Sequence, residues 1–243
     1  MKTSRFNSRG SAIARWTPQT RARMHGKRDE SRKPSKASLT FAARQTFVRP
    51  MQRAITALIN DYHQAVADRD EARQEDVRSS ILTQLEAFDA CDGDGHAYPD
   101  WIRPVMRANA LAAFGDLDEA VAYELEGAMH AELDMHKAIS ANNLSDHYRR
   151  LGRHEQAVEQ AALAYDLWPE NDGIIVNLAL ALYKAGQRDA AGRIISQLAA
   201  ASPEKGILDA HLQFEEEMRE MEDLPEVRDL IEQARGGSKP NEP

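Results

Sequence analysis

Apolar residues recur along this chain at the spacing of an α-helix. Between residues 50 and 90, two stripes place apolar side chains three or four positions apart, so that each stripe covers one face of a helix. A charged stretch, Asp68–Asp76, separates the stripes, and it is compatible with a helical hairpin or with one long bent helix. The stripes comprise Ile55, Leu58, Ile59, Tyr62 and Val66, and then Val77, Ile81, Leu82, Leu85 and Phe88.

Two parts of the chain lack this pattern. Residues 1–49 show no sustained period, and basic residues and serine dominate them. Such a segment buries too little apolar surface to offset the entropy lost on ordering, so we expect a disordered arm. Further on, Gly93, Gly95 and Pro99 predict a loop over Cys91–Pro99.

Two consecutive windows of 34 residues, Ala138–Asn171 and Asp172–Lys205, carry similar residues at the same offsets. A fixed period of this kind predicts a repeat architecture, in which each unit buries its apolar face by stacking on its neighbours. The matched pairs are Leu144 and Leu178, Tyr148 and Leu182, Gly152 and Gly186, Ala157 and Ala191, Ala161 and Ile195, Ala164 and Leu198, and Pro169 and Pro203.

A shared hexapeptide of the form Gly-x-x-acid-x-Ala extends the repeat towards the N-terminus. It occurs at Gly115–Ala120, Gly152–Ala157 and Gly186–Ala191. The glycine suits a tight turn between two helices, and the acidic residue falls in the first turn of the second helix, where the helix dipole favours negative charge. Gly115 and Gly152 are 37 residues apart rather than 34, which predicts about one extra turn in that unit's second helix or in its connection.

The pattern resembles the tetratricopeptide repeat (TPR) family, clearly over residues 138–205 and weakly over residues 101–137. The resemblance implies an all-α fold, a short TPR-like helical-repeat solenoid with flanking helices. The period fades after Pro203, so we expect a polar capping helix over Ile207–Met221 and a last short helix that Pro225 opens. The expected parts are a disordered basic arm (1–49), a helical segment or hairpin (50–90), a repeat domain with a C-terminal capping helix (101–235), and a tail (236–243).

The resemblance also implies a function. TPR arrays typically act as non-catalytic adaptors or scaffolds that bind a peptide or helix of another protein in a concave groove. An incomplete carboxylate clamp is expected, since Asn142 stands where some family members have lysine. Equally, these polar side chains could simply solvate an exposed helix face. The implied groove residues are Asn142, Asn143, Asp146, Arg149, Arg150, Asn177, Tyr183 and Lys184.

Charge is divided unevenly along the chain. Residues 1–50 hold 13 Lys and Arg against two acidic residues, whereas the other 193 residues hold 18 basic and 37 acidic ones. The alternative function is therefore a nucleic-acid-associated accessory protein whose arm binds the phosphate backbone or another anionic surface. A solubilising tail, a targeting segment and an arm that folds back remain open. The cations in question are Arg21, Arg23, Lys27, Arg28, Arg32, Lys33 and Lys36.

Sequence motifs give no support for catalysis, a cofactor or a metal. There is no phosphate-binding loop, nucleophile elbow or zinc-protease pair, so we expect no enzyme. Asp92–Gly95 lacks the first carboxylate and the final glutamate of a calcium loop, and His130 and His136 are expected on opposite sides of one helix. Cys91 is the only cysteine and no apolar run could span a bilayer, so a cytoplasmic location is expected, with organellar targeting by the arm left open.

Overall fold

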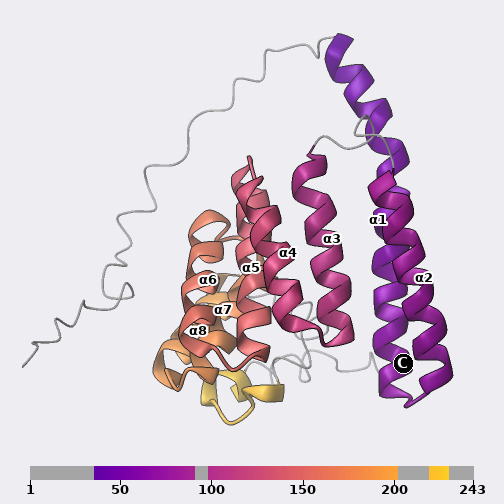
Figure 1. The fold of residues 1–243 in the computed structure, drawn as a ribbon. Helices are drawn as coiled ribbons and strands as arrows, with labels where there is room; N and C mark the ends of the chain where they lie inside the picture. Colours follow the sequence, from indigo (N-terminus) through magenta and orange to yellow (C-terminus); the bar gives the residue numbers. More distant parts are fainter. Residues whose placement is uncertain (1–35, 91–97, 202–218, 230–243) are drawn as a thin grey trace, which may run out of the picture. The chain divides into compact units, whose positions relative to one another are not determined.

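The computed structural model describes residues 36–90, 98–201 and 219–229. Over these ranges the chain is all-α and contains no strand, as a helical-repeat fold requires. Among the same residues, no helix is both long and apolar enough to cross a membrane. Figure 1 shows the helices α1 (Lys36–Ala67), α2 (Glu71–Ala90), α3 (Pro99–Phe114), α4 (Leu117–Met129), α5 (Asp134–Arg150), α6 (His154–Leu167), α7 (Asp172–Lys184) and α8 (Arg188–Ala201).

Helices α1 and α2 form a hairpin, which decides between the two alternatives that the sequence leaves open. The chain turns between Ala67 and Glu71, where Arg69 adopts a left-handed φ of 56°. Arg73 pairs with Asp61 across the hairpin. The apolar stripes of both helices join one core with α3, although Val66 and Leu82 at their edges stay exposed.

Helix α1 begins earlier than the apolar pattern predicts. It starts at Lys36, inside the expected arm, and it passes through Pro50. The segment from Lys36 to Arg49 contains neither glycine nor proline and includes several good helix formers, so its local propensity favours a helix even without a clear apolar face. The rest of the predicted arm, residues 1–35, lies outside the described residues.

Three helical hairpins follow, α3–α4, α5–α6 and α7–α8, and each packs on the next. The glycine of the shared hexapeptide ends the first helix of each hairpin, with φ of 89° at Gly115, 72° at Gly152 and 76° at Gly186. In all three turns the glycine N–H donates to the carbonyl three residues back, and the next N–H donates to the carbonyl five residues back. This is the Schellman pattern, and its left-handed backbone is the reason for glycine.

The alanine that ends each hexapeptide is fully buried at Ala120, Ala157 and Ala191. The extra turn of the first repeat interval lies in neither of the expected places. Helix α4 has 13 residues against 14 in α6, and both connections have four residues, whereas α5 has 17 residues against 13 in α7. The prediction was wrong because the N-terminal turn of α5 is helical, which the repeat spacing alone cannot reveal.

Residues 219–229, here called the C-terminal strap, complete the described structure (Figure 1, yellow). Pro225 opens a short helical stretch, residues 225–229, as predicted. Most of the expected capping helix, Ile207–Met221, lies outside the described residues. Its last residue, Met221, is fully buried together with Leu224 and Val227 in the core that α5 to α8 share, so the strap is packed rather than merely solvated.

Candidate functional site

The groove residues implied by the family resemblance lie on the first helices of two successive hairpins, α5 and α7, which contact each other. We call these residues the α5–α7 face: Asn142, Asn143, Asp146, Arg149, Arg150, Asn177, Tyr183 and Lys184.

The asparagines of the face connect neighbouring helices. Asn177 donates from its amide to the backbone oxygen of Asn142 at 3.1 Å and to its side-chain oxygen at 3.0 Å. Asn143 donates to Asn109 Oδ1 of α3 at 3.4 Å and to Glu124 Oε2 of α4 at 3.2 Å. These amides therefore join the repeat units together, which gives asparagine a structural role at this position of both repeats.

Two cations of the face converge on one carboxylate of the strap. Lys184 Nζ pairs with Glu220 Oε2, and Arg149 Nη1 lies 3.7 Å from Glu220 Oε1. Arg149 also donates to Asp146 Oδ1 at 2.5 Å within α5. Only 15% of the Arg149 side chain is exposed, so its charge is less screened by water than that of a surface ion pair. Arg150 instead donates to the carbonyl of Ala112 at 2.7 Å and anchors α5 to α3.

A second ion pair links the strap to the start of α8. Arg188 Nη2 lies 2.5 Å from Asp223 Oδ2, and the Tyr183 hydroxyl lies 3.5 Å from Arg188 Nη1. The hydrogen bond from Arg188 is the main cause that lowers the pKa of Asp223. The apolar residues of the strap follow its acidic residues along the chain, Met221 after Glu220, and Leu224 and Val227 after Asp223. The side chains of all three are part of the hydrophobic core.

This arrangement places Arg149, Lys184 and Arg188 around the acidic side chains of the strap, next to its buried apolar side chains. Sequence reasoning missed Arg188 and the contacts of the strap with the repeat helices, although it predicted the short helix that Pro225 opens. The available signal was the spacing of Met221, Leu224 and Val227, which lie three residues apart. Glu220 directly precedes Met221, and Asp223 directly precedes Leu224. That signal is short, and it is separated by 17 residues from α8, so it has no fixed relation to the repeat period.

A buried carboxyl group lies behind the face, in the first repeat unit. Glu124 follows Gly115 by nine residues, and the equivalent positions in the next two units are Ala161 and Ile195. All three side chains are fully buried. Burial raises the pKa of Glu124 to about 8, although hydrogen bonds from Ser140 and Asn143 offset part of the effect. A charged residue at an apolar repeat position was the sequence signal for this group.

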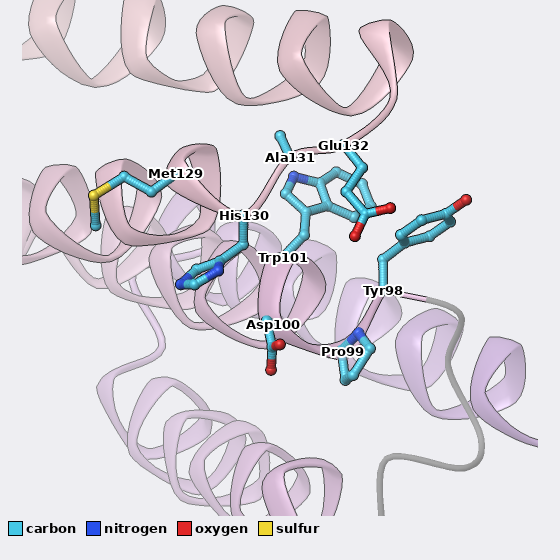
Figure 2. A pocket seen from close by; sticks show the side chains of 8 residues that line it. All are labelled: Tyr98, Pro99, Asp100, Trp101, Met129, His130, Ala131 and Glu132. Atoms are coloured by element: carbon cyan, nitrogen blue, oxygen red, sulfur yellow. The ribbon is translucent and has the colours of Figure 1, made fainter.

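A separate hollow of about 370 Å³ lies near the α4–α5 connection, and its lining includes Tyr98 and Trp101 beside the acidic Asp100 and Glu132. Figure 2 shows Met129 and His130 at one end of the lining side chains and Tyr98 at the other, with Trp101 and Glu132 between them. Trp101 stacks on the buried His136, with ring centroids 3.7 Å apart, and its indole N–H donates to Ser140 at 3.1 Å. The Met129 side chain is 78% exposed beside this hollow.

The histidines of this region do not lie on one helix, contrary to expectation. Helix α4 ends at Met129 and α5 begins at Asp134, so His130 lies in the connection and His136 in α5. The stretch from His130 to Asp134 contains no glycine or proline, so the sequence gives no local signal for the break. The burial of His136 against Trp101 explains why this part of the chain turns into the core.

Several predicted positions lie outside the described residues. These are Cys91, the segment Asp92–Gly95 and six of the seven arm cations, whereas Lys36 is the first residue of α1. In the part of the chain that the structure does describe, no group of three or more His, Cys, Asp or Glu side chains could hold a metal ion.

Comparison of the chain with known protein families and with curated proteins found no match. The geometry of the α5–α7 face and the strap is therefore the main support for a function.

Proposed function

We propose that this chain is a non-catalytic adaptor of the TPR kind, which holds a segment of another protein on the α5–α7 face. One observation carries the proposal. Arg149 and Lys184 come from two successive repeat units, and both meet a single carboxylate, that of Glu220. Cations that converge from neighbouring helices are suited to hold a peptide across the repeats, because they fix both its position and its register.

The apolar part of the same contact supports this function. Met221, Leu224 and Val227 of the strap bury their side chains in the core of α5 to α8, so the contact between the strap and these helices combines an apolar core with a charged rim. This combination is characteristic of protein–protein interfaces. The contact that the strap makes with α5 to α8 thus has the anatomy of an interface within one chain.

Affinity capture with the full chain tests the proposal. The unmodified chain and a variant with Arg149→Glu and Lys184→Glu serve as baits in extracts of the source cells. We expect a protein that the unmodified chain captures to be absent from the capture by the variant. The matched control carries Lys137→Glu together with Arg153→Glu, which reverses two charges that pair with Asp134 and Asp118 away from the face. We expect this control to capture the protein normally.

Two results would contradict the proposal. Equal capture by the face variant and its control would exclude the α5–α7 face as the binding surface. Capture that instead requires residues 1–35 and falls steeply with salt would favour the alternative function, binding of nucleic acid by the basic arm. A cytoplasmic location stays a prediction from the sequence.

A further inference from the structure

We propose that the strap, residues 219–229, occupies the α5–α7 face as a built-in ligand, and that the partner binds by displacing it with a segment of the same chemistry. The inference rests on the proposed function, because it names the partner class and the regulation of that same face. The expected partner segment carries two acidic side chains three residues apart. Each is directly followed by an apolar side chain that becomes buried on binding.

The strap shows which side chains the face and the neighbouring helix α8 accept, since Glu220 contacts the face whereas Asp223 pairs with Arg188 of α8. Its acidic residues, Glu220 and Asp223, lie three positions apart and meet cations from α5, α7 and α8. Its apolar residues, Met221, Leu224 and Val227, repeat at the same interval of three and are all buried. The two series are offset by one residue, so charge recognition and apolar burial occur in one register. A partner segment needs this pattern rather than acidic character alone.

Within the described part of the chain, the strap leaves one hydrogen-bond donor of the face without a partner. Arg149 Nε is buried and has no hydrogen-bond partner among the described residues. The nearest strap oxygen to its guanidinium is 3.7 Å away, which is too far for a hydrogen bond. A partner carboxylate that engages Arg149 through two parallel N–H groups would satisfy this donor, and such bidentate contacts are stronger and more specific. The partner can therefore improve on the contact that it replaces.

The remaining charge contacts of the strap are accessible to a competitor. The side chains of Arg188 and Asp223 are 48% and 54% exposed, so their ion pair contributes little to holding the strap. The strap is held instead by the burial of Met221, Leu224 and Val227 and by its tether, since 17 residues join it to α8 and give it a high effective concentration. Displacement then depends on the concentration and fit of the partner segment.

A reversible covalent lock on the strap tests the inference in the full chain. A Cβ placed on Gly192 would lie 2.6 Å from the carboxyl carbon of Glu226, so the Glu226 side chain lies directly over Gly192 of α8, and this pair of positions is the one chosen for a cysteine cross-link. The chain carries Gly192→Cys, Glu226→Cys and Cys91→Ser. The probe is a fluorescein-labelled peptide with the sequence of residues 217–231, and its binding is followed by anisotropy before and after reduction.

We expect the reduced chain to bind the probe and the oxidised chain to bind it at least about tenfold more weakly, because only the oxidised strap cannot leave the face. Adding Lys184→Glu should abolish binding by the reduced chain, whereas Lys137→Glu should not. Circular dichroism melts of each form verify folding, and mass spectrometry verifies the disulfide.

Equal binding by the oxidised and reduced chains would overturn the built-in ligand, while a charge-dependent capture of another protein would still support the proposed adaptor. Failure of the folded, reduced chain to bind the probe would overturn the proposed partner chemistry. Loss of charge dependence in the capture experiment itself is the separate result that would overturn the adaptor function.

Discussion

Asn143 donates a hydrogen bond to Glu124 at 3.2 Å, and the carboxyl group that accepts it is fully buried in the first repeat unit. The bond links α5 to α4 and makes a residue of the α5–α7 face part of the folded core. Face and core are thus coupled through one amide, and the protonation of Glu124 bears on the stability of the whole repeat stack.

Glu124 predicts that stability falls as the pH rises. Its pKa in the folded chain is about 8, above the ordinary value of 4.5, so the folded state retains a proton that the unfolded state releases between these values. The stabilising contribution is complete below pH 4.5 and is lost as the pH rises through 8. Each unit of pKa difference corresponds to about 1.4 kcal/mol.

Urea denaturation of Glu124→Gln checks this prediction. The variant keeps an oxygen that can accept the bond from Asn143, but it cannot ionise. We expect the variant and the unmodified chain to have equal free energies of unfolding near pH 4, and the variant to be more stable by about 5 kcal/mol near pH 9. The same decline of stability with pH in both proteins would contradict the assignment.

His147 predicts the opposite dependence in acid. Burial lowers its pKa to about 4, with Arg150 lowering it further and Asp146 opposing the shift. Between pH 6.5 and 4, His147 is therefore protonated in the unfolded state, where its pKa has the ordinary value of 6.5, but stays neutral in the folded state. Stability is complete above pH 6.5 and falls as the pH drops through 4. Measured by urea denaturation between pH 4 and 7, His147→Gln should flatten this decline, and an unchanged slope would exclude His147 as its source.

Much of the fold was predictable because its signals are local and periodic. The glycine turns at Gly115, Gly152 and Gly186 follow from a spacing that the sequence displays directly, and their positive φ angles are confirmed. The start of α1 at Lys36 was not predictable from apolar stripes, since local propensity rather than an amphipathic pattern favours helix there. The break at His130 also lacks a local signal and arises from tertiary packing.

The candidate site was predictable only in part. The family resemblance implied groove residues on the helices that are α5 and α7, but it could not show that Asn177 bonds to Asn142 or that Lys184 pairs with Glu220. These contacts join residues some 35 positions apart, and they depend on how the helices stack. Whether the groove residues bind a partner stays a prediction.

Gly127 marks a close approach of α3 and α4. A Cβ at this position would lie 2.8 Å from Val105 Cγ2 and 3.1 Å from the carbonyl oxygen of Trp101. We expect Gly127→Ala to lower the free energy of unfolding by about 1–3 kcal/mol, because the two helices must separate to admit the methyl group. Combining it with Val105→Ala should cost less than the sum of the single changes. Simple additivity would show that Val105 is not the obstacle.

Binding of the labelled 217–231 peptide to the full chain carrying Glu220→Lys and Asp223→Lys tests the central claim most directly. These substitutions repel the strap from Arg149, Lys184 and Arg188 but leave the cations of the face in place. We predict saturable binding that is stronger than in the unmodified chain, weakens with salt and disappears with Lys184→Glu. A folded variant that binds no peptide, or that binds it equally well with Lys184→Glu, would contradict the account.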